Sequence, residues 1–167
     1  MERVRLPLLT AAVVIVACLV PAITPADARR PVAPRLQQFS RDHWPGTFGG
    51  LWLRRSRSKG EHIAVAFTRG VAKRRETILR IYKRPGVYIK VVKVDLTEHD
   101  LARIQREVVK KVDRLPIRSW GVGQDIMNNR VSVTLPKPMP KFESHLRYLY
   151  GSGNVHFDYG VISPTTG

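Results

Sequence analysis

Apolar and polar residues alternate along several short stretches of the chain, and this period of two predicts β-strands. The strands at 48–53 and 62–68 are joined by a polar, basic segment at 54–60, which predicts a β-hairpin. A second hairpin is predicted over 120–135, because Asn128-Asn129 supplies residues that tolerate the left-handed backbone of a tight turn. Single strands are expected at 87–94 and 154–162.

A period of three to four residues predicts three helices, at 71–82, 97–115 and 142–150. In the second, Thr97 and Asp100 form a sequence of the capping-box type, and Pro116 is expected to end the helix. Its apolar stripe consists of Leu101, Ile104, Val108, Val112 and Leu115. In the third, we expect Phe142, Leu146 and Leu149 to face inward.

The predicted order is ββαβαββαβ, which indicates an α+β fold: a mostly antiparallel or mixed sheet with two or three helices packed on one face, in a single domain. We expect that domain to span residues 46–162, after a flexible proline-containing lead-in at 29–45 and before a polar tail at 163–167. Trp52 and Tyr82 are assigned to its core. The sequence shows no evident internal repeat.

Residues 1–28 have the pattern of a targeting segment. Arg3 and Arg5 precede an uncharged, mostly apolar run, and Ala26-Asp27-Ala28 offers the small residues that a signal peptidase cleaves after. Two alternatives stay open: a bacterial lipoprotein carrying its lipid on Cys18, or an uncleaved anchor. Each alternative predicts a bacterial protein that is secreted or associated with the cell envelope.

The composition limits the kinds of site and partner that the chain can have. The 167 residues include a single cysteine, which excludes a disulfide framework and a multi-cysteine metal site. Lys and Arg number 29 against 13 Asp and Glu, for a net charge of +16. Such a charge favours contact with an anionic partner, although it also serves solubility alone. The candidate anion-binding residues are Arg54, Arg55, Arg57, Lys59, Lys73, Arg74 and Arg75.

Signals for catalysis are weak. There is no Gly-x-Ser-x-Gly elbow, and the five histidines are never spaced at i, i+4. His156 and Asp158 would share one face of a strand, a pairing that arises easily by chance. We therefore expect a protein that is not an enzyme and that binds no metal or cofactor. We expect no nucleic-acid partner, because there is no recognisable binding module or aromatic platform.

The segment from Asp125 to Val133 has the form D-x-x-x-N-x-V-x-V, with Trp120 upstream. It resembles the pro-region module of secreted bacterial serine proteases of the α-lytic type and its stand-alone exported actinobacterial relatives, and the likeness covers residues 46–136. Elementary chemistry gives the motif a structural role, with Asp125 and Asn129 bonding to backbone at a turn while Val131 and Val133 fill a sheet face.

In that family, pro-regions assist the folding of their protease and inhibit it, and an extended C-terminal segment enters the substrate cleft. The resemblance therefore implies a non-catalytic module that acts in trans on a secreted serine protease, because no catalytic domain follows in this sequence. The corresponding tail would lie within 155–166, with Val155, Phe157, Tyr159, Val161 and Ile162 as its apolar residues. The alternative is a basic envelope protein that binds anionic polymers or surfaces.

Overall fold

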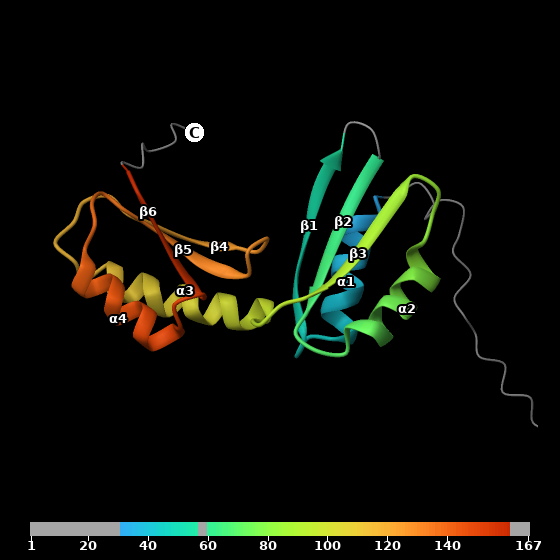
Figure 1. The fold of residues 1–167 in the computed structure, drawn as a ribbon, viewed down its shortest axis with the longest axis horizontal. Coiled ribbons are helices and arrows are strands. Elements are labelled where there is room, and N and C mark those ends of the chain that lie inside the picture. Colours follow the sequence, from blue (N-terminus) through green and yellow to red (C-terminus); the bar gives the residue numbers. More distant parts are fainter. Residues whose placement is uncertain (1–30, 57–59, 161–167) are drawn as a thin grey trace, which may run out of the picture. The chain divides into compact units, whose positions relative to one another are not determined.

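The computed structural model describes residues 31–56 and 60–160, with the backbone alone at 54–56 and 60–61. They belong to one compact unit. Its elements follow the order αββαβαββαβ (Figure 1). In the first half these are α1 (Val32–His43), β1 (Phe48–Ser56), β2 (Gly60–Phe67), α2 (Val71–Tyr82) and β3 (Val87–Lys93). In the second half they are α3 (Glu98–Val112), β4 (Gly121–Asp125), β5 (Arg130–Leu135), α4 (Pro140–Tyr150) and β6 (Val155–Tyr159).

The first sheet has the strand order β1-β2-β3. β1 and β2 form the predicted antiparallel hairpin, and α2 crosses over so that β3 runs parallel to β2. Alternate residues of β2 point into a core that α1 and α2 complete. Its largest fully buried side chains are Phe48, Phe67, Leu36, Ile63 and Ile78.

The second sheet repeats this topology with the order β4-β5-β6. β4 and β5 are antiparallel, and β6 returns parallel to β5 after the α4 crossover. Val131, Val133 and Leu135 of β5 are fully buried beneath α3 and α4. Each half is therefore a helix, a hairpin, a crossover helix and a parallel edge strand, with both helices on one face (Figure 1).

The α+β class and the mixed strand pairing are confirmed. The number of sheets and helices differs from the prediction, because the described residues form two three-stranded sheets and four helices instead of one sheet with two or three helices. This structural repeat was not evident in the sequence, because matching positions of the two halves are alike in being apolar but differ in residue type. The buried positions of β2 are Ile63, Val65 and Phe67, and their counterparts in β5 are Val131, Val133 and Leu135.

The expected flexible lead-in at 29–45 is wrong, because residues 32–43 form α1. Pro31 and Pro34 are compatible with this helix since the first turn has backbone N–H groups without intrahelical acceptors. Val32, Ala33, Leu36 and Ser40 lie on its buried side. The folded domain thus begins well before residue 46.

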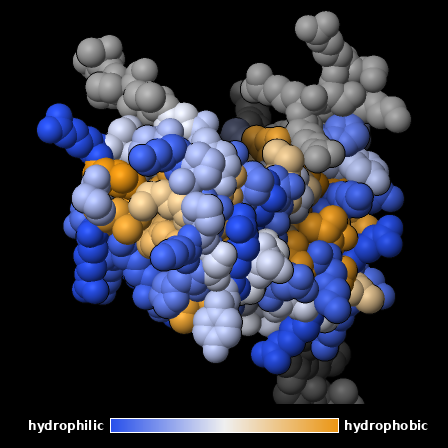
Figure 2. All heavy atoms as spheres, turned by 60° about the vertical axis from the view of Figure 1, so that its left-hand side comes forward, coloured by the Kyte–Doolittle hydropathy of each residue, from blue (hydrophilic) through white to orange (hydrophobic). Residues whose placement is uncertain are grey.

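Other differences are local. The capping box of α3 is confirmed, but the helix ends at Val112, before Pro116. In α4, Leu146 is fully buried, whereas Leu149 is 43% exposed and Glu143 takes the inward position instead. Tyr82 belongs to the first core, but Trp52 packs against neither core. No helix among the described residues is both long and apolar enough to cross a bilayer. Figure 2 shows hydrophilic side chains over most of one face, with apolar ones in separate clusters.

Candidate functional site

The motif that carries the family resemblance forms the β4–β5 turn. The Asp125 carboxylate accepts hydrogen bonds from the backbone N–H of Asn128 at 3.2 Å and from its side-chain amide at 2.8 Å. Nε of Arg130 lies 3.1 Å from the same carboxylate. Burial alone would raise the pKa of Asp125, but these donors together hold it below the ordinary value. The predicted structural role of Asp125 is confirmed.

Asn129 extends the turn to a distant segment. Its φ is +53°, in the left-handed region, as the turn requires. Its Oδ1 accepts from the backbone N–H groups of Asp95 and Leu96 at 3.0 and 2.8 Å, and its Nδ2 donates to the Leu96 carbonyl at 2.9 Å. These residues connect β3 to α3. Asn129 therefore ties the second hairpin to the link between the two halves.

The remaining motif residues support the fold. Val131 and Val133 are fully buried in the second core, and Trp120 packs partly buried against it. Their side chains therefore contribute to the second core, Trp120 at its partly exposed edge. The contacts of this motif are those of a turn and a core; that it takes no part in binding stays a prediction.

The predicted partner-binding tail is wrong in its first half. Val155 is 3% exposed and Phe157 is 7% exposed, because β6 pairs with β5 and turns these side chains into the core. Tyr159 ends the strand and is 49% exposed. Val161 and Ile162 lie outside the described residues. Of the predicted tail residues that the structure describes, Tyr159 alone is exposed.

The end of β6 is held in place by α4. Glu143 is 5% exposed; its Oε1 accepts from the backbone N–H of Met139 at 2.8 Å, and Arg147 lies 3.6 Å away. The Arg147 guanidinium sits 4.8 Å from the centre of the Phe157 ring. Desolvation and a hydrogen bond with Glu143 raise the pKa of the Tyr159 hydroxyl. These contacts fix the strand from which the segment at 160–167 continues.

The candidate anion-binding residues differ in how far the structure describes them and in their exposure. Arg57 and Lys59 lie outside the described residues, and at Arg54 and Arg55 only the backbone is described, in β1. Lys73 and Arg75 are exposed on the first turns of α2. Arg74 behaves differently: its guanidinium lies 5.1 Å from the Phe67 ring centre and 5.6 Å from that of Trp44, and it donates to the Arg69 carbonyl.

Around Arg74 lies a pocket of about 230 Å³, lined also by Trp44, Gly70, Lys73 and Thr77. Burial and then the neighbouring Arg69 lower the pKa of Arg74. No acidic residue occurs in the first turn of α2, so the positive end of this helix is surrounded by positive side chains. Such a pocket would favour an anion.

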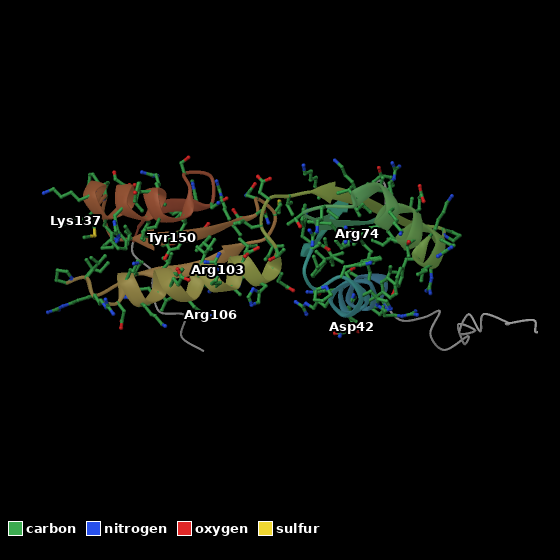
Figure 3. The ribbon with its side chains drawn as sticks, turned by 90° about the horizontal axis from the view of Figure 1, so that it is seen from below. Asp42, Arg74, Arg103, Arg106, Lys137 and Tyr150 are labelled. Carbon is green, nitrogen blue, oxygen red and sulfur yellow. The ribbon has the colours of Figure 1, made fainter. Side chains whose placement is uncertain are left out.

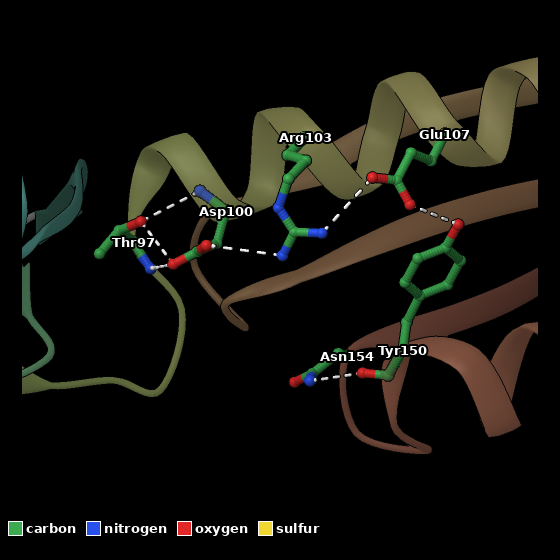
Figure 4. A network of polar contacts seen from close by, with 6 residues as sticks. All are labelled: Thr97, Asp100, Arg103, Glu107, Tyr150 and Asn154. Carbon is green, nitrogen blue, oxygen red and sulfur yellow. Dashed lines mark hydrogen bonds and ion pairs between the residues drawn. The ribbon is translucent and has the colours of Figure 1, made fainter.

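A polar network on α3 and α4 was not predicted beyond its capping box (Figures 3 and 4). Arg103 lies between two carboxylates, 3.6 Å from Asp100 and 3.4 Å from Glu107. The Tyr150 hydroxyl donates to Glu107 at 2.9 Å, and burial together with this bond raises the pKa of Tyr150 to about 12. The network joins α3 to α4, one on each side of an open pocket of about 390 Å³. Its members are paired with one another, which indicates a structural role.

The register places Ser132 opposite His156, and Nε2 of His156 lies 3.3 Å from Asp158. His156 and Asp158 are 41% and 55% exposed, so solvent screens the pair. No hydrogen bond joins Ser132 to His156 in the described part of the chain. No group of three or more His, Cys, Asp or Glu there could hold a metal ion.

Comparison with known proteins adds no assignment: no protein-family model matches the chain, and no curated protein matches it.

Two features were not predicted from the sequence. The first is the pocket around Arg74, since Trp44 lies in the segment expected to be a flexible lead-in. The second is the position of Trp52, which hydrophobicity alone assigned to the core. The alternation within β1 was a usable signal, because Leu51 and Leu53 already occupy the side opposite Trp52.

Proposed function

We propose that the chain is an exported, non-catalytic binding protein: a stand-alone module of the pro-region type that acts in trans on a secreted serine protease. The observation that carries the proposal is that β6, an edge strand, is held by Glu143 and Arg147 up to Tyr159, after which the sequence of the proposed binding segment begins. The motif at 125–133, whose sequence resembles the pro-region module, adds to it: Asp125 and Asn129 make the turn hydrogen bonds, and Val131 and Val133 are buried.

The mode of binding follows from this geometry. Residues 160–167 extend to at most roughly 28 Å, a length that covers several substrate positions of a cleft. An extended segment in a cleft forms main-chain hydrogen bonds, while pockets receive alternate side chains such as those of Val161 and Ile162. The fixed strand before the segment lowers the entropy lost on binding.

The test is inhibition of a purified α-lytic-type serine protease by the chain at low and moderate salt. A variant without residues 160–167 is the comparison, since it leaves β6 and the core intact. We expect inhibition that persists at moderate salt and is lost with the segment. Equal inhibition by both proteins would refute the proposed binding mode, and absence of inhibition would refute the protease partner.

A second candidate function, binding of anionic polymers of the cell envelope, is favoured by the pocket around Arg74 and the exposed cations Lys73 and Arg75. It predicts affinity for polyphosphate that falls steeply with salt, because counterions are released on binding. Charge reversal at Lys73 and Arg75 should weaken this affinity, whereas removal of 160–167 should leave it unchanged. The two functions are thus distinguished by the same set of proteins.

A further inference from the structure

The face of the first sheet opposite α1 and α2 carries an aromatic surface. Ile63 and Val65 of β2 point into the core, so the residues between them point the other way. The register aligns Trp52, Ala64 and Lys90 in one row across the three strands. His62 and Tyr88 are aligned in the next row. We call Trp52, His62, Ala64, Tyr88 and Lys90 the aromatic face.

The aromatic face is open to solvent. Tyr88 is 56% exposed, Lys90 is exposed, and Trp52 and His62 are partly exposed. The His62 and Tyr88 rings lie 5.0 Å apart between centres. Ala64, which is 9% exposed, leaves a low position between Trp52 and Lys90. Farther along the sheet the side chain of Ile126 packs against Gly50, so the open area is confined to one end.

Its charge is of one sign. The rows from Gly50 to Arg54, with their partners on β2 and β3, contain no Asp or Glu. Lys90 takes part in no ion pair with the residues that the structure describes. Nε2 of His62 is buried without a hydrogen-bond partner in the described part of the chain.

The second sheet provides an internal comparison. Its corresponding face presents Gly121, Gly123, Ser132, Thr134, His156 and Asp158. These side chains are small or polar, include a carboxylate and lack a large aromatic ring. The shared topology therefore does not require aromatic residues on this face, and those of the first sheet need another explanation.

We propose that the aromatic face binds an anionic polysaccharide. The apolar faces of sugar rings would stack on Trp52 and Tyr88, whose flat rings offer contact area at low conformational cost. Lys90 would pair with the acidic groups of the chain. Trp52 lies on β1 and Tyr88 on β3, in neighbouring rows of the same face, so their Cα atoms are roughly 12 Å apart. This spacing suits a polymer better than a single sugar.

This inference rests on the second candidate function, whose ligand class it specifies; it adds a binding surface on the sheet face opposite α2 and does not depend on protease binding. Single-stranded nucleic acid also stacks on aromatic residues. A polysaccharide is favoured because the targeting pattern of residues 1–28 predicts a location outside the cell.

The test is calorimetric titration with four probes: polygalacturonate, neutral dextran, polyphosphate and a single-stranded oligonucleotide. Tyr88→Ala and Trp52→Leu are the variants, each checked for an unchanged melting temperature. Tyr148→Ala is the matched control, because Tyr148 is 87% exposed on α4, away from this sheet. Of the four probes, we expect polygalacturonate to bind the parent chain most tightly. Its affinity for Tyr88→Ala and for Trp52→Leu should be at least about tenfold lower than for the parent chain, because each variant loses one aromatic ring on which sugars stack.

The outcomes separate the inference from the function on which it rests. If polygalacturonate and polyphosphate bind equally well to all variants, the aromatic face is refuted while anionic-polymer binding stands. If no probe binds, both fail. Tighter binding of the oligonucleotide would overturn the polysaccharide assignment. A loss confined to polygalacturonate in Tyr88→Ala and Trp52→Leu, with Tyr148→Ala unchanged, supports it.

Discussion

Asn129 holds Leu96 by both of its backbone polar groups: Oδ1 accepts from the Leu96 N–H at 2.8 Å, and Nδ2 donates to its carbonyl at 2.9 Å. The two residues are far apart in the sequence: Asn129 lies in a hairpin turn, and Leu96 lies in the link between the two halves. The side-chain amide of Asn129 offers the Leu96 backbone one acceptor and one donor, as a residue of a neighbouring strand would. This contact makes the β4–β5 turn part of the connection between the two repeats.

Asn129→Ala should lower the free energy of unfolding by about 3 kcal/mol, because it removes three hydrogen bonds and puts at positive φ a residue that tolerates the left-handed region less well than asparagine. Asn129→Gly relieves the backbone and should cost less. Asn128→Ala is the control, since the Asn128 side chain donates its hydrogen bond to Asp125 within its own turn. Urea denaturation gives the values, and equal losses for Asn129→Ala and Asn128→Ala would contradict this account.

Thr97→Ala should cost about 1 kcal/mol, because the Thr97 hydroxyl accepts from the backbone N–H of Asp100 at 3.0 Å and caps α3. Thr97→Ser should retain most of the stability. Thr77→Ala, within α2, is the matched control and should be close to neutral, since alanine is the better helix former there. Denaturation midpoints that rank Thr97→Ser below Thr97→Ala would exclude the capping explanation.

Alkaline stability should depend on Tyr150. Its pKa is raised to about 12 in the folded protein by burial and by the bond to Glu107, against an unfolded value of 10.0. The stabilisation is therefore complete below pH 10 and is lost as the pH rises toward 12. Tyr150→Phe should flatten this decline, whereas Tyr148→Phe on the same helix should not. Urea midpoints measured across this range provide the check, and identical pH profiles for Tyr150→Phe and the parent chain would refute it.

Removal of residues 155–167 should unfold the second half, because it deletes β6 together with the buried Val155 and Phe157. Removal of 160–167 should change the unfolding free energy by less than about 1 kcal/mol, since surface changes are usually small. Far-ultraviolet circular dichroism and urea midpoints distinguish the two. A folded chain without 155–167 would mean that β6 contributes little to the core.

The sequence predicted strands and helices well where one face is buried. The stripe from Leu101 to Val112 and the alternation at Val131 and Val133 correspond to fully or almost fully buried positions. The cap at Thr97 was predictable because its signal is local, within three residues. The α+β class followed from the order of these elements.

Long-range contacts were not predictable in the same way. Nothing local indicates that Asn129 reaches Leu96, or that Arg74 lies over Trp44 and Phe67. The first helix was missed because Pro31 and Pro34 suggested a flexible segment, although both are compatible with a helix start. The burial of Val155 and Phe157 depends on a parallel partner strand that the α4 crossover brings into place.

The central claim, that the segment after Tyr159 occupies the substrate cleft of a secreted serine protease, is tested most directly by titrating the chain into two forms of the protease. In one form the cleft is free, and in the other it is blocked by a covalent peptide inhibitor. We predict that binding to the blocked protease is at least about a hundredfold weaker, since the segment and the inhibitor compete for one site. Equal affinity for the two forms would contradict the claim.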